Sequence, residues 1–520
     1  MVAPATQEMI NVVIIADGKE VSVSVPVGDT VQDTLDAAWI TLGSMDRIEP
    51  GVYEVLSSET QVRVIRVKEE FTVEQEIIPF ERKILQTESL PEGSTLLAQK
   101  GENGLREITL RHIYEDGVET SNKQMSESRI IEDAIPEIVM VGIRAPFTPI
   151  PIPGRIVYLL GGNAWMMQET TGNRRPVVTT GDLDGRIFSL SPDGTWLLFT
   201  RRSIEKDQIN SLWAAWLDSE TGQESLVDLK VPNIVHFADW VPISTNNKIV
   251  FSTVEPRSTA PGWQANNDLV ALNFSPSGWL SKWGYYVDAN SGGVYGWWGT
   301  NFAWEPGGGR LAYARPDGIG LVNLEDGSFQ SIMDILPLQT KGDWAWVPWI
   351  TWGANGEALF VVNHLPQSGA PSPEESQIFD LAVVSFSQGS PFTIVSQTGM
   401  FAYPMASPRL NPEGIEYKVA YLQALFPLQS DSSRYRLMSM DRDGSNQVEL
   451  FPPEGQPGLE PQRVAWSPTP LKDTTHHALA VIYQGNLWLV DVNPDRSAGK
   501  QAWQITGDGL SSRVVWGGGS

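Results

Sequence analysis

The chain of 520 residues contains no cysteine. Disulfide bonds, thiolate catalysis and thiolate metal sites are therefore excluded. Long hydrophobic runs are missing as well, because no stretch approaches the roughly 18 apolar residues that cross a bilayer. With 41% hydrophobic and 19% charged residues, the composition is that of a soluble globular protein, and no membrane insertion is expected.

Basic residues are also scarce. Thirty-seven lysines and arginines stand against sixty-two acidic residues, which gives a formal net charge of −25. Such a surface repels phosphate backbones and anionic lipid head groups, so nucleic acid is not an expected partner. The start MVAPATQEMI has neither a basic region nor an apolar core of a signal peptide. The expectation is a cytoplasmic protein, or an exported one whose signal or anchor is absent from this chain.

The first 66 residues predict a small module of two strands and a helix. VVII, the turn Asp17-Gly18 and the alternating valines at 21, 23 and 25 indicate a hairpin. Thr30 and Asp33 have the spacing of a helix capping box. The apolar face that follows includes Trp39, which we expect in the core of this module.

Residues 68–143 are strand-like, with turns at LPEG (90–93) and YEDG (114–117). IIPF at 77–80, these two turns and the glycines at 101, 104 and 142 resemble the five-glycine (G-five) domain of bacterial cell-surface proteins. The segment before it, through ADGKE, DTVQDTLDAAWITLG and DRIEP, is similar to the ubiquitin-like domain that precedes G-five modules in resuscitation-promoting factors.

This resemblance covers about the first 145 residues, and its glycines have a simpler explanation in turns that require a positive φ. It implies an extracytoplasmic protein near peptidoglycan, in a family proposed to bind polymers that contain N-acetylglucosamine. The lysozyme-like domain of resuscitation factors does not follow here, so the resemblance implies no hydrolase. The predicted order is a ubiquitin-like domain (9–66), a G-five domain (67–144), a proline-rich linker (145–153) and a fourth domain (154–520).

The fourth domain is repetitive. FSLSPDGTWLLFTRR (188–202), FAWEPGGGRLAYAR (302–315) and ITWGANGEALFVVN (350–363) each contain a strand, a tight turn and an apolar strand. Two further strands follow each copy, and four antiparallel strands per repeat predict the blade of a β-propeller. The SPDG turn resembles TolB-like and WD-repeat propellers, which implies a fold and hardly a function.

The two ends of the repeat region complement each other. Residues 155–179 are predicted to hold the second, third and fourth strands of a blade, and RVVWGGGS (513–520) its first strand. Pairing these strands would close a ring of seven blades without an open sheet edge. Six blades is the alternative, and the whole chain is predicted to be mainly β.

One tryptophan recurs at the end of the first strand of the repeats, just before the turn: Trp240, Trp304, Trp352, Trp466 and Trp516. A residue type that recurs at one structural position is expected to pack between blades. Trp352 ends the stretch DWAWVPWITW (343–352), which contains three more tryptophans.

The remaining aromatic residues lie in loops. Most occupy the links between the last strand of one blade and the first strand of the next, or the loops between second and third strands. Both sets emerge on the face that propellers commonly use for ligands. The predicted binding residues are Trp263, Trp297, Trp298, Trp344, Trp346, Trp349 and Tyr403, accompanied by Phe401 and Phe426. Exposed rings of this kind usually mark binding, and the alternative is that the loops bury their own rings over the channel.

Catalytic and metal motifs are missing. G-x-S-x-G, H-E-x-x-H and the phosphate-binding G-x-x-x-x-G-K-[ST] do not occur. The five histidines (112, 236, 364, 476 and 477) are scattered over strands and a polar turn, so neither a metal nor a cofactor is expected. Asp343 and Glu305 lie near the predicted faces but without a motif, so a carboxylate pair cannot be assigned.

These observations predict a non-enzymatic bacterial protein of the cell surface or cell wall. Its expected partners are a wall polymer for the N-terminal modules and a glycan or a protein for the aromatic face. One alternative is a subunit of a surface layer, sheath or filament, in which the aromatic face docks on another copy. The second is a hydrolase or lyase that acts on polysaccharide or peptidoglycan through carboxylates.

Overall fold

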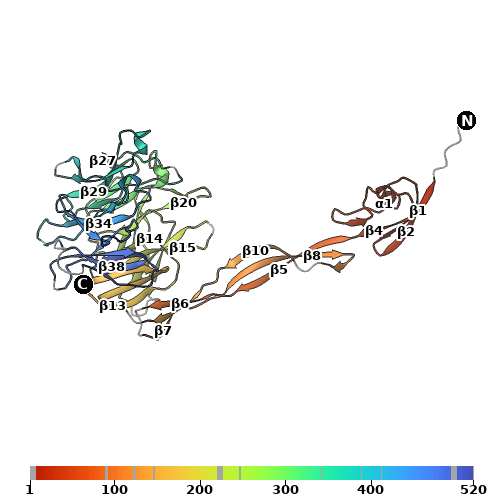
Figure 1. Cartoon of the computed structure of the whole chain (residues 1–520), viewed down its shortest axis with the longest axis horizontal. Coiled ribbons are helices and arrows are strands. Elements are labelled where there is room, and N and C mark those ends of the chain that lie inside the picture. The colour runs from red at the N-terminus through yellow and green to blue at the C-terminus, as the bar shows by residue number, and fades with distance from the viewer. Residues whose placement is uncertain are drawn as a thin grey trace. The chain divides into compact units, whose positions relative to one another are not determined.

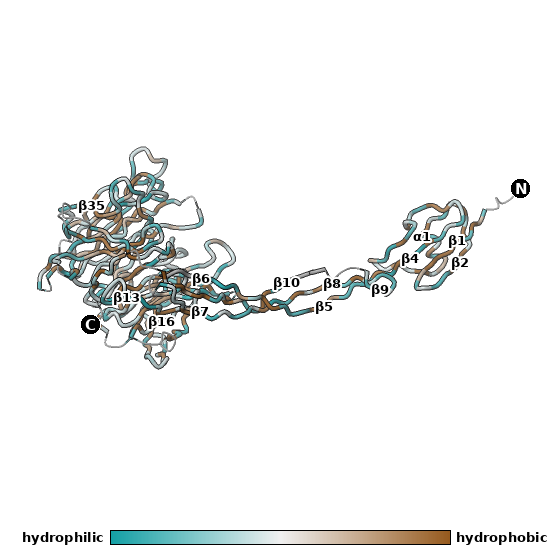
Figure 2. The backbone as a smooth tube through the Cα atoms, turned by 60° about the horizontal axis from the view of Figure 1, so that its bottom comes forward, coloured by the Kyte–Doolittle hydropathy of each residue, from teal (hydrophilic) through white to brown (hydrophobic). Residues whose placement is uncertain are grey.

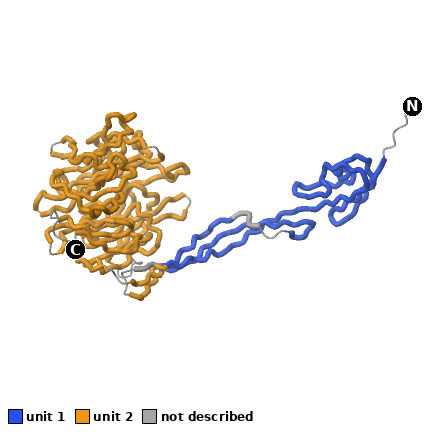
Figure 3. Tube along the Cα trace, in the orientation of Figure 1, with its two compact units in different colours: residues 1–83, 100–138 blue, residues 84–99, 139–520 orange. Residues whose placement is uncertain are grey.

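The computed structural model describes residues 8–87, 92–120, 124–143, 147–205, 207–218, 226–244, 247–340, 342–387, 389–411, 413–472, 474–493 and 501–518, without the side chains of 85–87 and 124–127. Two compact units make up the chain (Figure 3): residues 1–83 with 100–138, and residues 84–99 with 139–520. Both units consist mainly of strands (Figure 1). No helix of the described residues is long and apolar enough to span a membrane.

The first unit begins with a four-stranded sheet and one helix. The sheet order is β2-β1-β4-β3. The elements are β1 (Met9–Ala16), β2 (Lys19–Pro26), α1 (Val31–Ala37), β3 (Arg47–Glu49) and β4 (Thr60–Ile65). Asp17 and Gly18 have φ values of 53° and 70°, so they form the tight turn that the sequence predicts. Thr30 Oγ1 accepts from the Asp33 N–H, and the Asp33 carboxylate accepts from the Thr30 N–H, which confirms the capping box.

Trp39 is not in the core of this module, which corrects the prediction. Its side chain is 92% exposed. The helix ends at Ala37 and Ala38 caps it, so Trp39 already lies beyond the helix with a φ of 60°. Helical spacing no longer places residues on the buried face at that point. The core consists instead of Val12, Ile14, Ala16, Val25, Val31, Leu35, Leu56, Val62 and Val64.

Long strands form the next segment. β5 (Val67–Ile78) and β10 (Gln124–Glu132) flank β8 (Gly104–Glu115), which also pairs with β9 (Val118–Glu119). Large apolar residues of β5, including Phe71 and Ile77, stay exposed because nothing among the described residues covers this sheet. A second sheet has the order β6-β11-β7, from β6 (Arg82–Thr87), β11 (Glu137–Gly142) and β7 (Thr95–Gln99).

The second unit contains, among its described residues, six four-stranded antiparallel sheets that resemble propeller blades. Their strands follow one another in the sequence: β14 (Leu183–Leu190), β15 (Trp196–Arg202), β16 (Asn210–Trp216), β17 (Leu226–Pro232); β18 (Phe237–Trp240), β19 (Asn247–Ser252), β22 (Leu269–Phe274), β23 (Gly284–Val287); β24 (Asn301–Trp304), β25 (Leu311–Arg315), β26 (Gly318–Val322), β27 (Phe329–Asp334); β28 (Ile350–Trp352), β29 (Ala358–Leu365), β30 (Ile378–Ser385), β31 (Pro391–Val395); β32 (Met405–Ala406), β33 (Lys418–Ala424), β34 (Tyr435–Asp441), β35 (Val448–Phe451); β36 (Ala465–Trp466), β37 (Ala478–Tyr483), β38 (Asn486–Asp491), β39 (Ala502–Gln504). Loops between them carry the hairpin β20 (Val254–Pro256) and β21 (Trp263–Ala265), and the short 3-10 helices η1 (Gly296–Trp298), η2 (Pro373–Glu375) and η3 (Pro427–Gln429).

The two ends of the repeat region share one further sheet. β40 (Ser511–Gly517) pairs antiparallel with β12 (Pro151–Leu160), as predicted, and β12 pairs with β13 (Asn163–Val178). The sheet differs from the prediction in having three strands, because residues 163–178 form one continuous strand where two were expected. Gly172 packs against Pro149 at the point where a turn would have reversed the chain. Residues 151–153, predicted as the end of the linker, already belong to β12.

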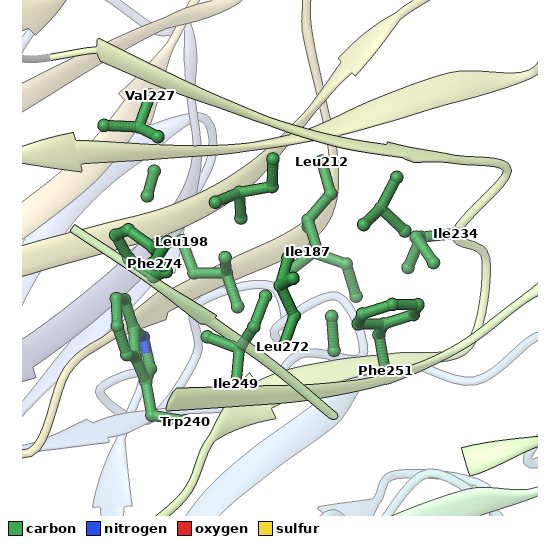
Figure 4. Packing of buried hydrophobic residues seen from close by; sticks show 14 of the residues in the cluster. Ile187, Leu198, Leu212, Val227, Ile234, Trp240, Ile249, Phe251, Leu272 and Phe274 are labelled. Atoms are coloured by element: carbon green, nitrogen blue, oxygen red, sulfur yellow. The ribbon is translucent and has the colours of Figure 1, made fainter. Parts of the chain in front are cut away.

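Apolar side chains fill the space between neighbouring sheets of the second unit. Hydrophobic stretches of the tube run through this unit (Figure 2). Between the sheet of β14–β17 and that of β18, β19, β22 and β23, Leu198 and Leu212 face Trp240, Ile249 and Phe274 (Figure 4). The alternation of strand side chains therefore buries one set of residues on each sheet face.

The recurrent tryptophans join one sheet to the next. Trp240, Trp352, Trp466 and Trp516 are buried, and Trp304 is half-buried, which confirms their predicted packing role. Three of their indole N–H groups donate to carbonyls of the preceding sheet's first strand: Trp240 to Ser189 (3.3 Å), Trp352 to Ala303 (2.9 Å) and Trp466 to Met405 (2.9 Å). Packing and a directional bond at the same position fix the spacing of neighbouring sheets.

Candidate functional site

Two links between neighbouring sheets meet on one face of the second unit. The first, between β27 and β28, contains Trp344, Trp346 and Trp349, and the second, between β31 and β32, contains Phe401 and Tyr403. Two indole hydrogen bonds tie the links together. Trp346 Nε1 donates to the Met400 carbonyl at 3.1 Å, and Trp349 Nε1 donates to the Pro404 carbonyl at 3.2 Å.

A partly open pocket of about 190 Å³ lies between these links. Trp344, Trp346, Trp349 and Tyr403, four of the seven predicted binding residues, line it together with Ala345, Val347, Met400 and Phe401. Aromatic rings thus surround a concave space, which is the usual form of a small-ligand site.

The tryptophans of the pocket differ in burial. Trp344 is 41% exposed, whereas Trp346 is 3% exposed. The Trp346 ring packs edge-to-face on Phe379, with the ring centroids 5.0 Å apart, and lies 6.2 Å from the ring of His364. Trp346 therefore forms the buried floor of the pocket, and Trp344 is an exposed aromatic side chain of its lining.

A positive charge lies beside Trp349. Trp349 and Tyr403 meet edge-to-face at 5.8 Å, and the guanidinium of Arg463 lies 5.0 Å from the centroid of the Trp349 ring. Solvent reaches Arg463, yet surrounding protein desolvates it enough to lower its pKa, and neighbouring Arg513 lowers that pKa further. Burial raises the pKa of the Tyr403 phenol, while Arg463 and Arg513 counteract this increase.

A second aromatic cluster contains Trp263 and Trp298. Trp263 lies on β21 and contacts the Trp298 ring edge-to-face at 6.3 Å and the ring of His236 at 4.5 Å. His236 Nε2 is buried without a hydrogen-bond partner. Burial, with a smaller contribution from Arg186, lowers the pKa of His236 to about 4. Trp297, on η1 beside Trp298, is 38% exposed.

The seven predicted binding residues therefore fall into two groups rather than one platform. No ring contact joins the two groups among the residues that the structure describes. Phe426, expected nearby, lies exposed in the loop before β34 and does not line the pocket.

Arg463 and Arg513 are the functional candidates that the sequence reading missed, although a signal for them exists. Arg463 and Arg513 stand three residues before Trp466 and Trp516, as Trp349 stands three residues before Trp352. The repeat alignment thus places Trp349, Arg463 and Arg513 at one position, three residues before the recurrent tryptophan. Two hydrogen bonds between the Gln462 amide and the Ile482 backbone, of 2.6 and 2.7 Å, fix the chain next to Arg463.

In the part of the chain that the structure describes, no three His, Asp or Glu side chains are grouped so that they could hold a metal ion. The buried histidines serve structure. His112 Nδ1 lies 2.7 Å from the Glu119 carboxylate and His112 Nε2 2.8 Å from Thr72 Oγ1, while His364 contacts the carbonyls of Leu336 and Ser376.

Residues 69–144 match the family model of the G5 domain, the five-glycine domain. Two solved structures resemble this segment. The structure titled HP0197-G5 is 19% identical, with a TM-score of 0.14, and the match covers 15% of this chain and 99% of that chain. The G5 domain of an IgA1 protease is 20% identical, with a TM-score of 0.13 and coverage of 16% and 94%.

A putative TolB from Agrobacterium tumefaciens is similar to a larger part of the chain. It is 15% identical, with a TM-score of 0.33, and the match covers 62% of this chain and 95% of that chain. No curated protein matches the chain. The chain thus carries a G5 domain, which is typical of bacterial cell-surface proteins, followed by a β-rich region of propeller-like sheets.

Proposed function

We propose that this chain is a glycan-binding protein of a bacterial cell surface and that it holds a sugar ring in the pocket between Trp344 and Tyr403. The carrying observation is the pocket itself, a concavity of about 190 Å³ in which aromatic side chains from two links converge. Aromatic faces bind the apolar C–H faces of sugar rings, and the indole and phenol groups retain polar edges for hydroxyl groups.

The dimensions of the site favour a sugar over a folded protein. A stable protein partner needs about 800 Å² of surface on each side, usually with a flat, well-packed centre. Here the exposed part of the site is mainly Trp344, because Trp346 is buried and Trp349 and Tyr403 are half-buried. A narrow aromatic concavity of this kind suits one ring of a polymer chain.

The N-terminal modules are proposed to keep the protein at the wall. The G5 match supports this location, and the exposed residues of β5 and β10 offer a long surface to a wall polymer. The resemblance of residues 9–66 to a ubiquitin-like domain is part of the same proposal.

A closed ring of seven blades is the proposed architecture of the second unit. The pairing of β40 with β12 supports closure, and the tryptophan bonds between successive sheets support the blade order. Such a ring would hold the links before β28 and β32 rigidly next to each other, so the pocket would be formed before a ligand arrives.

A glycan array and a peptidoglycan pull-down with the full chain test the proposal. Trp344→Ala should weaken binding at least tenfold, about 1.4 kcal/mol. Trp216→Ala is the matched control, because Trp216 is also 41% exposed but lies at the end of β16. Equal binding by both variants, or binding to none of the glycans, would refute the proposed function.

A further inference from the structure

Two arginines lie together beside the aromatic pocket. Arg463 contacts the ring of Trp349, and both Arg463 and Arg513 are close enough to interact electrostatically with each other and with Tyr403. Both side chains are exposed to solvent. Like charges near each other repel, and an anion bound beside them would relieve this repulsion.

Among the described residues, no carboxylate forms an ion pair with Arg463 or Arg513, and Arg513 Nε donates to the Gly185 carbonyl at 3.1 Å. The nearest carboxylate in electrostatic range is Asp239. It accepts from Ser189 Oγ at 2.7 Å and from the Trp240 N–H at 2.9 Å, and burial raises its pKa.

Several other arginines of the second unit form ion pairs with carboxylates. Arg155 pairs with Asp218, Arg201 with Asp182 at 2.9 Å, and Arg310 with Glu305 at 3.1 Å. The chain has a net charge of −25, so acidic partners are plentiful. Arg463 and Arg513, which form no ion pair among the described residues, therefore place two positive charges near the aromatic pocket of an acidic protein, and such a site fits an anionic ligand group.

We propose that the pocket selects a sugar residue that carries a carboxylate, with the ring against Trp344 and the carboxylate on Arg463 beside Trp349. This inference rests on the proposed glycan-binding function and names the class of sugar. The guanidinium presents parallel N–H donors that match the two oxygens of a carboxylate. Arg513 would add a second positive charge to the same place.

The pocket volume limits the ligand to about one ring. Pockets for larger organic ligands span about 300 to 1,000 Å³, and this one is about 190 Å³. The anionic group must therefore belong to the residue in the pocket, because a charge farther along the polymer would not reach Arg463 from the aromatic wall.

Methyl β-glucuronide and methyl β-glucoside form a matched pair of probes, since they differ in a carboxylate against a hydroxymethyl group. Calorimetric titration of the full chain with each sugar, to about 10 mM, covers the weak affinities expected of single sugars. The glucuronide should bind at least tenfold more tightly, and added salt should weaken its binding but not that of the glucoside.

Variants separate the charge from the fold. Arg463→Gln should weaken glucuronide binding at least tenfold more than it weakens glucoside binding, and Arg463→Lys should restore part of the loss. Arg442→Gln is the control, because Arg442 pairs with Glu416 at 3.4 Å, whereas it is Arg463 whose guanidinium lies over the Trp349 ring of the pocket. The comparison of the two sugars on the unchanged protein needs no variant. It therefore still tests the preference for an acidic sugar if Arg463→Gln fails to fold.

Equal affinity for the two sugars, or no glucuronide binding at about 10 mM, would overturn the inference. The glycan-binding function survives that result if neutral glycans bind on the array and Trp344→Ala abolishes their binding. A third probe, N-acetylglycine, carries the carboxylate without a sugar ring. If it binds as tightly as the glucuronide, the arginines recognise carboxylates of any origin, and the assignment to an acidic sugar is also wrong.

Discussion

Acidification should destabilise the second unit through His236. The imidazole lies beneath Trp263 and against Gly299, and its Nε2 has no hydrogen-bond partner. Arg186 is the charged group that acts on it. Protonation in the folded state therefore places a positive charge in a dry site, near an arginine, without an acceptor for the new N–H. The unfolded chain offers water instead.

The pKa of His236 falls from 6.5 in the unfolded chain to about 4 in the folded protein. The stability contributed by the neutral imidazole is complete above pH 6.5 and is lost as the pH falls toward 4, because only the unfolded state takes up the proton in that range. Linkage gives a loss of about 2 kcal/mol between pH 7.5 and pH 5.0, and of about 3 kcal/mol once the pH is well below 4. Asp239, Asp268 and Asp508 have raised pKa values and change stability in the opposite direction.

The variant His236→Gln isolates this contribution, because the aspartates act equally in both proteins. Urea unfolding at pH 7.5 and 5.0 can be followed by tryptophan emission, since Trp39 alone of the twenty tryptophans lies outside the second unit. The unchanged protein should lose about 2 kcal/mol more than the variant between the two pH values. A difference below about 0.5 kcal/mol would show that His236 titrates normally in the folded protein, and the reasoning from its burial would be wrong.

Two further predictions concern stability. Trp352→Ala should lower the free energy of unfolding by about 3 to 5 kcal/mol, because a buried indole and its hydrogen bond to Ala303 are lost. Trp344→Ala should change the free energy of unfolding by no more than about 0.5 kcal/mol. Equal losses of the two variants in urea unfolding would contradict this division. Deleting residues 511–520 should destabilise the second unit by more than about 5 kcal/mol, because β12 loses its partner strand and the buried Trp516 is removed. A melting temperature within a degree or two of the full chain would contradict the sharing of one sheet by both ends.

The repeated sheets were predictable because the pattern of buried residues repeats along the sequence together with the strands. A tryptophan before each turn has one environment in every sheet, so comparing copies within one sequence separates Trp352 from Trp344. The same comparison places Arg463 and Arg513 at the position of Trp349, which indicates that the three face the same way. Hairpin turns such as Asp17-Gly18 were predictable for a local reason, since their φ values favour particular residues.

The parts of the fold and of the site that the sequence did not predict depend on contacts between segments that do not repeat. The pocket arises because Trp346 reaches the carbonyl of Met400, 54 residues later, and neither link has a counterpart elsewhere in the sequence. Trp263 and Trp298 gather around His236 for the same kind of reason. Trp39 was placed wrongly because the spacing of its apolar neighbours continues past the residue at which the helix ends.

Trp346 and Trp344 should have separable roles, and Trp346→Phe tests this division. Phenylalanine keeps a ring against Phe379 but removes the indole N–H donor. The Met400 carbonyl then loses this hydrogen-bond partner, which should lower the free energy of unfolding by about 1 to 3 kcal/mol. Because that bond holds the two links together, glycan binding should weaken along with stability. Trp344→Ala should weaken binding alone. Trp213→Phe is the control, since the Trp213 indole donates to Ser211 Oγ two residues away on its own strand and joins no separate segments. If Trp346→Phe unfolds at lower urea but binds glycan with unchanged affinity, the bond between the links does not shape the pocket, and the ligand depends on Trp344 and its neighbours without the floor beneath them.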